Sequence, residues 1–415
     1  MTEHATTSSA GTPATGITAT GTTATGRRRA SLALAATAVV GLVVGPVGAA
    51  AAAPSGDAPL AVQSAGADAV EGSYIVTLEA GSDAEDVAAD LGVVPDEVYD
   101  VAVDGFAADL DAAELAAVQR DPDVVAIEED AVVTLDATQR VAVGGGLYGL
   151  DRIDQRNRPL SGTYTYGSTA SGVTAYVVDT GIATSHPDFG GRARNVYDAL
   201  GGNGQDCNGH GTHVAGTIGS ATYGVAKGVQ LRGVRVLGCD GSGSTSGIIA
   251  AVDWVRGNAV KPAVANMSLG GGYSAALNRA VDSLAASGVS IAVAAGNENQ
   301  DACAVSPASA GGALTVAASD QTDTRASFSN YGSCAEIYAP GVGITSTWLN
   351  GGTNTISGTS MASPHVAGAM ALVKARYGDL PSSQVNDTLV QNATTGVVAR
   401  NVGSTSNRLL FKGGL

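Results

Sequence analysis

The feature that most constrains the fold is an alternation of apolar strands and helices that begins after Ala137. The pattern predicts strands at residues 173–178, 231–236, 264–267, 289–295 and 314–318. It predicts helices at residues 213–220, 246–258, 275–287 and 360–376. Strands that are apolar throughout and separated by helices are typical of a doubly wound, mostly parallel α/β sheet with helices on both faces. Functional residues of such sheets lie in loops at the carboxyl ends of the strands.

The first 53 residues predict a leader that directs export. Residues 1–26 are mostly Thr, Ala and Gly without hydrophobic periodicity, which predicts disorder. Three arginines (27–29), an apolar run (32–47) and a small-residue tract (48–53) then form the three-part pattern of an export signal. A membrane anchor is the alternative, but glycines and a proline interrupt the apolar run and no polar stop follows it. The arginines permit either the general or the twin-arginine route.

Residues 54–136 form a separate acidic segment. The whole chain has a formal net charge of −16, yet 21 acidic residues and one basic residue lie between Pro54 and Asp136. From Ala137 onward 18 basic residues oppose 16 acidic ones, so neither part has the charge of a nucleic-acid-binding protein. Between about 72 and 135 short strands and helices alternate, which predicts a small α+β unit. This unit contains no cysteine and no histidine, so we expect it to bind or to assist folding rather than to catalyse.

A serine lies at the start of an apolar helix in the sequence GTSMASPHVAG, residues 358–368. Ser360 follows a glycine and a threonine, and apolar residues recur after it at helical spacing. An oxyanion formed beside such a serine meets unpaired backbone N–H groups and the positive end of the helix dipole. The position therefore suits a nucleophile in acyl transfer. The structural alternative is a helix N-cap, for which serine is a preferred residue.

A nucleophilic serine needs a base to take its proton and an acid to orient that base. Asp179 follows an apolar strand in AYVVDTGI, and His210 lies between glycines at the start of a predicted helix in NGHGTHVAG. The other histidines after Ala137 lie in a loop or within apolar helices, so His210 is the accessible candidate for a general base. A two-histidine metal site at HGTH is the alternative, but it lacks a glutamate between the histidines and a third ligand nearby.

A fourth polar residue, Asn297, ends the apolar run SIAVAAGN, where its carboxamide can donate a hydrogen bond to an oxyanion. The alternative role is that of a turn asparagine. The chain order Asp179, His210, Ser360 is the order of subtilisin and differs from the orders of chymotrypsin and the α/β-hydrolases. An esterase or lipase is disfavoured, because it would have a GxSxG motif and the order Ser, Asp, His.

The four cysteines all lie after Ala137, and none forms a CxxC pair. Zinc-ligand spacing is therefore absent, and an even number of cysteines in an exported chain favours disulfides. Three connectivities remain open. Sequential pairing would close two loops of about thirty residues, each contributing about 3–4 kcal/mol in the loop-entropy model.

Five motifs together resemble those of the subtilases, serine endopeptidases of the subtilisin superfamily. They are VVDTGI, HGTHVAG, ANMSLGGG, AAGN and GTSMASPHVAG, and they span nearly everything after Ala137. GLDRIDQR at 149–156 and the cysteine positions are similar to those of the proteinase K group and its aqualysin-like bacterial secreted enzymes. The resemblance implies a subtilisin-like peptidase domain over residues 137–415. It also implies two disulfides, Cys207 with Cys239 and Cys303 with Cys334.

The resemblance also gives the acidic segment a role. Residues 54–136 resemble a propeptide whose inhibitor-type unit, at about 72–135, acts as an intramolecular chaperone and inhibitor. In this family the carboxyl end of that unit lies in the active site before self-cleavage. Self-cleavage is then expected between about Thr134 and Thr138, most simply before Ala137.

An extended substrate-binding cleft is implied as well. Two chain edges would pair with the substrate backbone as added strands, and small apolar residues would wall the pocket for the P1 side chain. The edges are Gly241, Ser242 and Gly243 on one side and Ser268, Leu269 and Gly270 on the other. The pocket walls are Ala294, Ala295 and Gly296, with Leu269 and Gly270 opposite them. Such walls imply broad specificity with an apolar or aromatic P1 residue, because no acidic side chain is there to select Lys or Arg.

Structural calcium is implied at two places. The candidate ligands are Asp151, Asp154 and Gln155 at the first and, at the second, the carbonyls of Gly311 and Ala313 with the Glu336 carboxylate. Ser161 and Thr163 stand where some relatives have acidic or amide ligands, and relatives usually have aspartate in place of Glu336. The alternative for these side chains is a solvated surface.

We therefore predict a secreted, extracellular, self-processing serine endopeptidase. Ser360 is the predicted nucleophile, His210 the general base and then acid, and Asp179 the orienting carboxylate. Asn297 and the Ser360 backbone N–H form the predicted oxyanion hole. We expect protein or peptide substrates, a monomer, no organic cofactor, no nucleic-acid partner and no stable membrane association. The non-enzymatic alternative, a peptide-binding pseudoprotease, would be expected to lack one of the three triad residues.

Overall fold

The computed structural model describes residues 59–65, 69–134 and 147–415. All of them belong to one compact unit, Gly56–Leu415. The predicted leader, the export signal and the predicted cleavage point before Ala137 lie outside the described residues. Within the described part, no helix is both long and apolar enough to cross a membrane.

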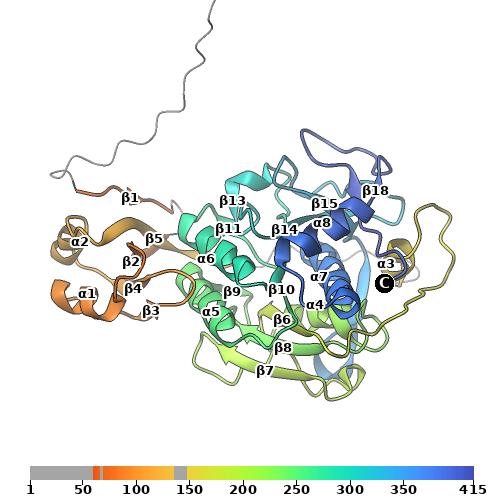
Figure 1. The fold of residues 1–415 in the computed structure, drawn as a ribbon, viewed down its shortest axis with the longest axis horizontal. Coiled ribbons are helices and arrows are strands. Elements are labelled where there is room, and N and C mark those ends of the chain that lie inside the picture. The colour runs from red at the N-terminus through yellow and green to blue at the C-terminus, as the bar shows by residue number, and fades with distance from the viewer. Residues whose placement is uncertain (1–58, 66–68, 135–146) are drawn as a thin grey trace, which may run out of the picture. The chain divides into compact units, whose positions relative to one another are not determined.

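A nine-stranded sheet forms the centre of the larger domain in the described part of the chain (Figure 1). The strand order is β18-β19-β15-β14-β12-β10-β6-β8-β7, and all neighbours are parallel except β18 and β19. The bounds are β6 Thr174–Asp179, β7 Ala193–Asp198, β8 Gln230–Arg235, β10 Ala263–Met267, β12 Ser290–Ala294, β14 Leu314–Ser319, β15 Ile337–Pro340, β18 Thr394–Thr395 and β19 Arg408–Leu409. The prediction of a mostly parallel sheet is confirmed.

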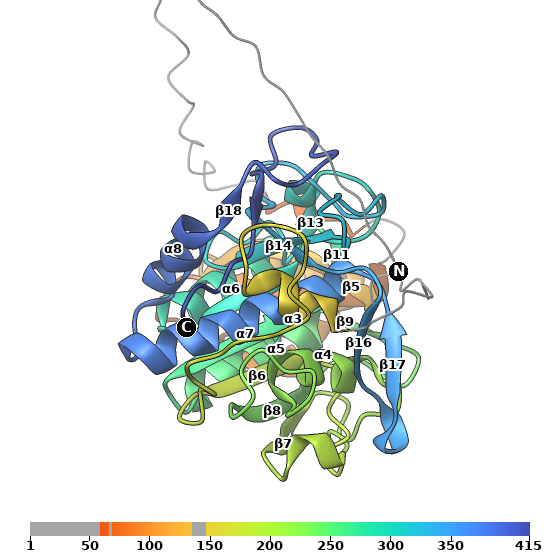
Figure 2. The same ribbon diagram turned by 90° about the vertical axis from the view of Figure 1, so that its right-hand side faces the viewer.

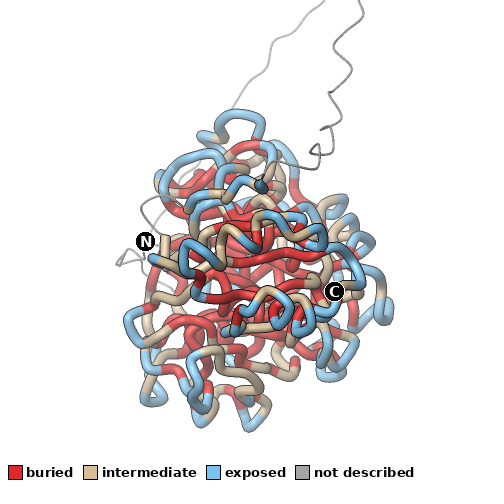
Figure 3. Tube along the Cα trace, turned by 90° about the vertical axis from the view of Figure 1, so that its left-hand side faces the viewer, coloured by how far each residue is buried: buried red, intermediate tan, exposed pale blue. Residues whose placement is uncertain are grey.

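Helices cover both faces of this sheet (Figures 1 and 2). In β6, Ala175 and Val177 share one core with α4 and α7, whereas Tyr176 and Val178 share a second core with α5 and α6. Successive strand residues point to opposite faces, so a strand covered on both faces must be apolar throughout. In Figure 3 the buried segments lie in the interior and the exposed segments lie around them. The helix bounds are α3 Tyr148–Ile153, α4 His210–Gly219, α5 Thr245–Asn258, α6 Ala275–Ala286, α7 Thr359–Tyr377 and α8 Ser382–Asn392.

Shorter elements decorate the larger domain. β16 pairs with β17, and β11 pairs with β13, both antiparallel. The bounds of these four strands and of the short strand β9 are β9 Ser242–Ser244, β11 Gly271–Gly272, β13 Val305–Ser306, β16 Ile344–Thr347 and β17 Thr353–Ile356. Short 3₁₀ turns occur at Pro187–Phe189, Ala302–Ala304 and Leu349–Gly351.

The five predicted strands match β6, β8, β10, β12 and β14 to within one residue at every end. The helix predictions match as closely, except that α4 begins at His210, three residues earlier than predicted. The prediction missed β7, β15 and α8. β7 (ARNVYD) is the edge strand, and α8 (SSQVNDTLVQN) buries only Ser382, Val385 and Leu389, so neither has a long apolar pattern.

The acidic segment folds as a small α+β domain. Its sheet has the order β1-β5-β2-β4-β3, and two helices cover it. The bounds are β1 Val62–Gln63, β2 Ala69–Leu78, α1 Ala84–Leu91, β3 Glu97–Tyr99, β4 Gly105–Asp109, α2 Ala112–Val118 and β5 Val124–Thr134. Asp83 caps α1, and Asp111 with Glu114 forms a capping box at the start of α2, so the acidic residues themselves define the helix starts.

The last strand of the acidic domain is hydrogen-bonded to the larger domain. β5 pairs antiparallel with β9 over three residues, Val132 with Ser244, Val133 with Gly243 and Thr134 with Ser242. β9 overlaps residues 241–243, which the sequence analysis predicted as a substrate-binding edge. The paired residues are 242–244 rather than 241–243, because Gly241 has φ +86° and its N–H donates to the Gly238 carbonyl within a turn.

Two carboxylates of β5 lie at helix N-termini of the larger domain. Asp130 accepts hydrogen bonds from the Ser246 N–H (2.9 Å) and hydroxyl (2.5 Å) at the start of α5. Glu128 accepts one from the hydroxyl of Ser274, the N-cap of α6 (2.5 Å). The N–H and hydroxyl groups at these helix starts thus give both carboxylates hydrogen-bond donors across the junction.

Two disulfides lie close to polar loops of the larger domain. The structure joins Cys207 to Cys239 and Cys303 to Cys334, the pairing that the resemblance implies. The first bridge begins three residues before His210, and the second begins six residues after Asn297. Each therefore restrains a loop that carries a predicted site residue.

Candidate active site

Asp179 is the last residue of β6 and is fully buried. Its Oδ1 accepts a hydrogen bond from the Thr180 backbone N–H (2.8 Å). A buried carboxylate needs hydrogen-bond partners, and the parallel sheet brings them, since α4 begins beside the carboxyl end of β6. The most important partner is His210.

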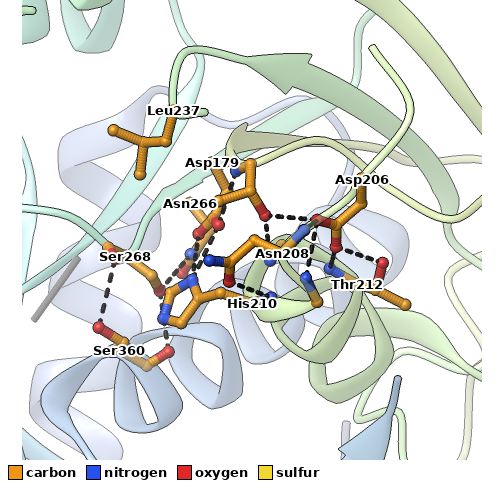
Figure 4. Close-up of polar contacts among 12 residues, drawn as sticks. Asp179, Asp206, Asn208, His210, Thr212, Leu237, Asn266, Ser268 and Ser360 are labelled. Atoms are coloured by element: carbon orange, nitrogen blue, oxygen red, sulfur yellow. Dashed lines mark hydrogen bonds and ion pairs between the residues drawn. The ribbon is translucent and has the colours of Figure 1, made fainter. Parts of the chain in front are cut away.

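His210 is the first residue of α4 and is 2% exposed. Its Nδ1 lies 2.8 Å from Asp179 Oδ1 and 3.0 Å from Oδ2. A contact with both carboxylate oxygens requires the proton on Nδ1, which leaves Nε2 as the basic nitrogen. In Figure 4 the imidazole lies between Asp179 and Ser360.

Ser360 is the second residue of α7 and is fully buried. Its hydroxyl donates a hydrogen bond to the Ser268 carbonyl (3.2 Å), and the Ser268 hydroxyl donates to the Ser360 carbonyl (2.8 Å; Figure 4). The N-cap of α7 is Gly358, which has no side chain. Ser360 therefore lies within the first helical turn, so the capping role considered from the sequence does not describe it.

The Asn297 side chain has a defined direction. Its Oδ1 accepts hydrogen bonds from the Thr359 N–H (2.8 Å) and hydroxyl (3.1 Å). The amide Nδ2 must therefore point the opposite way. Nδ2 is buried and has no hydrogen-bond partner among the residues that the structure describes. A buried amide without an acceptor is costly, so this group is available for a ligand oxygen.

Three further histidines of the larger domain have structural partners. Nε2 of His213 contacts the Ile344 carbonyl (3.0 Å), and complete burial lowers the His213 pKa to about 3. Nδ1 of His365 contacts the Met361 carbonyl (2.9 Å), and burial lowers the His365 pKa to about 4. His186 caps the 3₁₀ turn at Pro187–Phe189. His210 contacts Asp179 whereas His213 contacts the Ile344 carbonyl, so HGTH is not arranged as a pair of metal ligands.

The predicted pocket walls lie at the carboxyl ends of β10 and β12. Ala294, Ala295 and Gly296 are buried, as is Leu269, while Gly270 is half-buried. Gly296 has φ +98°, a conformation that favours glycine. The predicted walls thus consist of small or apolar residues that are buried or half-buried.

The first predicted calcium set converges on one turn. The Ser161 N–H donates to Asp151 Oδ1 (3.1 Å) and Gln155 Oε1 (2.9 Å), and the Ser161 hydroxyl contacts Asp151 Oδ1 (2.9 Å) and the Thr163 hydroxyl (2.8 Å). Asp154 accepts from the Thr165 N–H (2.6 Å), and burial raises the Asp154 pKa. Within the described ranges no three His, Cys, Asp or Glu side chains cluster as metal ligands. The set would therefore combine the carboxylates of Asp151 and Asp154 with the amide oxygen of Gln155, and such oxygen ligands suit calcium.

The second predicted set is centred on a half-buried carboxylate, that of Glu336. Glu336 accepts a hydrogen bond from the Thr315 N–H (3.1 Å), two residues beyond Ala313. Burial raises the Glu336 pKa, because this contact compensates its charge only in part. A cation nearby would offset that cost, so the donor chemistry fits here as well.

Sequence reasoning missed two residues that hold the site together. Asp206 accepts hydrogen bonds from the Thr180 hydroxyl (2.9 Å) and from the Thr212 N–H (2.9 Å) and hydroxyl (2.6 Å), so it ties the end of β6 to the start of α4. Thr359 fixes the Asn297 amide. Both lie within motifs that the sequence displays, but their roles depend on contacts between distant segments.

Comparison with known proteins gives matches over both domains. The profile described as the subtilase family (Peptidase S8) matches residues 170–409. The profile described as peptidase inhibitor I9 matches residues 94–136. The first match covers more than half of the chain, and the second lies in the acidic domain.

Similar proteins cover most of the same length. An extracellular serine proteinase of Thermus sp. (strain Rt41A) is 55% identical over 324 residues, 77% of this chain and 78% of the relative. Alkaline serine exoprotease A of Vibrio alginolyticus is 51% identical over 320 residues, 76% of this chain and 60% of the relative. The crystal structure of a cold adapted subtilisin-like serine proteinase has a TM-score of 0.63 and 52% identity, covering 64% of this chain and 98% of that one.

Proposed function

The chain belongs to the subtilase family of serine endopeptidases, and from that membership we propose that it is an exported enzyme that removes its own propeptide and then hydrolyses proteins with broad specificity. The observation that carries the assignment of residues is the contact of His210 Nδ1 with both oxygens of the buried Asp179. This contact fixes the tautomer that a general base requires.

In the proposed reaction Ser360 Oγ attacks the carbonyl carbon of the scissile bond while His210 Nε2 takes its proton. Asp179 stabilises the imidazolium that forms. His210 then gives the proton to the leaving amine, the C–N bond breaks and an acyl-enzyme remains. Water, deprotonated by His210 in turn, releases the acyl group and restores Ser360.

The tetrahedral intermediate carries a negative oxygen. We assign its stabilisation to Asn297 Nδ2 and the Ser360 backbone N–H at the start of α7. The hydrogen bonds from Thr359 to Asn297 Oδ1 support this role, because they turn the amide donor toward the cleft before any substrate arrives. A donor fixed in advance needs no reorganisation during the reaction.

Substrate would pair with β9 and with residues 268–270 as an added strand. The backbone pairing of β5 with Ser242–Ser244 supports this, since it occupies the first edge with an extended chain. Backbone pairing is insensitive to sequence, which agrees with broad specificity. We assign the apolar walls Ala294–Gly296 and Leu269–Gly270 to the P1 pocket, and we propose a preference for apolar or aromatic P1 residues.

The acidic domain is proposed to be the propeptide, residues 54–136, which is cleaved before Ala137 and precedes a mature domain of 137–415. The inhibitor I9 match and the β5–β9 pairing support an inhibitor that binds in the manner of a substrate. The extracellular Thermus relative supports secretion. One chain supplies all four assigned residues, which supports a monomer without an organic cofactor.

Calcium is proposed as a structural ion. Asp151, Asp154 and Gln155, with the Ser161 and Thr163 hydroxyls, would hold one ion, and the carbonyls of Gly311 and Ala313 with Glu336 would hold another. Bound there, calcium would fix surface loops and take no part in proton transfer.

Substitution of the nucleophile tests the proposal. Ser360→Ala, expressed in a host without secreted proteases, should accumulate the uncleaved chain after signal removal, whereas the wild type should yield a product that begins near Ala137. Intact mass of the secreted protein distinguishes the two. Labelling with a fluorophosphonate probe should occur in the wild type and be lost in the variant. Maturation of Ser360→Ala to the wild-type mass would contradict self-processing.

A further inference from the structure

A buried asparagine from a separate loop lies beneath the segment that carries Asn297. Asn330 is fully buried. Its backbone N–H donates to the Gly296 carbonyl (2.8 Å). On either side, the Asn299 N–H donates to the Phe328 carbonyl (2.8 Å) and the Tyr331 N–H donates to the Gln300 carbonyl (3.0 Å). The two segments therefore run together through backbone hydrogen bonds.

The Asn330 side chain uses its full hydrogen-bonding capacity on this one loop. Its Nδ2 donates to the Ala295 carbonyl (2.9 Å) and to Glu298 Oε2 (2.9 Å). Its Oδ1 accepts from the Glu298 N–H (3.1 Å) and the Gln300 N–H (2.9 Å). A carboxamide has two N–H donors and two acceptor lone pairs, so all four are engaged.

Asn330 lies so close to Gly296 that no side chain would fit at position 296 without a shift. A Cβ at Gly296 would lie 2.2 Å from Asn330 Nδ2, and Gly296 has φ +98°. The Asn330 contacts flank Asn297 on both sides, at residues 295 and 298. Asn330 thus holds the residues on either side of Asn297, while Thr359 holds the side-chain oxygen of Asn297.

We propose that Asn330 is a positioning residue that holds the oxyanion donor Asn297 and the adjoining wall of the P1 pocket in register with Ser360. This inference rests on the role proposed above for Asn297. Without the Asn330 carboxamide, the Ala295 carbonyl and the N–H groups of Glu298 and Gln300 lose buried partners, and the loop must shift to recover them. A small displacement of Asn297 Nδ2 weakens its hydrogen bond to the oxyanion, because that bond depends on the distance and direction of the donor.

A double-mutant cycle tests the proposal. Asn330→Ala, Asn297→Ala and the double variant are compared by kcat, KM and inhibition by a peptide boronic acid, with active sites counted by fluorophosphonate titration. Loss of Asn297 should lower kcat by about 10²–10³. Asn330→Ala should lower kcat by about 10- to 100-fold, within that limit, and weaken boronate binding in parallel. In the Asn297→Ala background it should lower kcat by less than about 2-fold, because the two act through one donor.

Matched variants separate positioning from general stability. Asn407 also hydrogen-bonds one residue's N–H and carbonyl, those of Val398 (both 2.9 Å), and it lies outside the site. Asn407→Ala should leave kcat per active site unchanged. Asn330→Asp is the second variant in case Asn330→Ala does not mature. It keeps the acceptors for Glu298 and Gln300 but loses both donors, and Glu298→Gln should restore part of its kcat by supplying a donor.

The outcomes are distinct. If Asn330→Ala keeps wild-type kcat per active site, or if the two losses multiply in the double variant, Asn330 does not act through Asn297 and the inference is wrong. If Asn297→Ala itself keeps full kcat, the proposed oxyanion role fails first, and the inference fails with it.

Discussion

At the scale of single residues, the proposed site depends on one carboxylate that orients the His210 imidazole and stabilises its protonated form. Asp179 is fully buried and contacts His210 Nδ1 through both oxygens. Burial makes the carboxylate an effective partner for the imidazolium, since little water competes for it. In the proposed mechanism, Asp179 therefore acts on Ser360 through His210.

Asp179→Asn tests whether Asp179 sets the tautomer of His210, because the substitution changes the hydrogen bond but hardly changes the size of the side chain. The amide can present an N–H to His210 Nδ1, which forces the proton onto Nε2 and removes the base. We expect kcat to fall by about 10⁴ with little change in KM. The measurement is steady-state hydrolysis of a chromogenic peptide, with enzyme counted by mass spectrometry. Asp188→Asn, at a carboxylate that contacts Thr222 beside His186, should keep wild-type kcat. A loss of less than 10-fold in Asp179→Asn would contradict the assigned base.

The candidate catalytic residues could be proposed from the sequence, whereas the residues that contact and position them could not. Asp179, His210, Ser360 and Asn297 each follow an apolar strand or begin a helix, so the sequence pattern exposes them. Asn330 acts through backbone groups of residues thirty or more positions away, and its own surroundings, FSNYG, read as an ordinary turn. Contacts of this kind depend on how two loops pack, which no local pattern determines.

At the scale of elements, the junction between the two domains combines a paired strand with two capped helices. β5 supplies the paired strand and the carboxylates Glu128 and Asp130. In the opposite direction, Asp253 of α5 accepts hydrogen bonds from the Val101 (3.0 Å) and Ala102 N–H groups of the acidic domain. No pattern in either segment predicted these caps. They arise because β5 reaches the amino ends of α5 and α6.

The junction should bind more tightly in acid. Burial raises the Glu128 pKa, although hydrogen bonds from Ser274 and Ala276 and the charge of Arg279 lower it in part. A carboxyl with a raised pKa in the complex favours its protonated form there. Its contribution to binding is therefore full below its ordinary pKa and is lost as the pH rises through the raised value.

We therefore expect the cleaved propeptide to dissociate faster at pH 8 than at pH 4, as measured by gel filtration after timed incubation. Glu128→Gln should flatten this pH dependence, with a remainder from Asp253, whose pKa burial also raises. Glu129→Gln is the control, because Glu129 contacts Ser64 and Ala65 within the acidic domain and should keep the wild-type slope. Faster release in acid would mean that protonation breaks these contacts.

At the scale of the whole molecule, one sheet separates two cores, and the acidic domain completes one of them. Ile75, Tyr99, Ala102 and Ala107 belong to the core that contains α5 and α6. The opposite core, with α4 and α7, belongs to the larger domain alone. Removal of the acidic domain would therefore expose only one face, while disulfides and the proposed calcium ions hold the loops around the site.

Calcium removal should lower the melting temperature of the mature, fluorophosphonate-inhibited enzyme. An ion present at 100 times its Kd contributes about 2.7 kcal/mol, enough to shift the melting temperature by several degrees. Scanning calorimetry with and without EGTA measures the drop, and added calcium should reverse it. Asp151→Asn should reduce the drop, whereas Asp320→Asn, at an exposed turn capped by Asp320, should not. If EGTA lowered the melting temperature of Asp151→Asn as much as that of the wild type, the calcium ion would not bind at Asp151.

The antiparallel pairing of β5 with β9 has a kinetic consequence. It gives any peptide bound at this edge a single polarity, with its carboxyl direction running from Ser244 toward Ser242. All the paired residues of β5 precede the proposed scissile bond, so cleavage breaks none of these hydrogen bonds. Under the proposed self-cleavage, the freed propeptide is the first product of the enzyme, and it keeps the β5–β9 hydrogen bonds that the acyl side of a substrate would make. On this proposal, inhibition by the propeptide is product inhibition, and dilution or digestion of that product should relieve it.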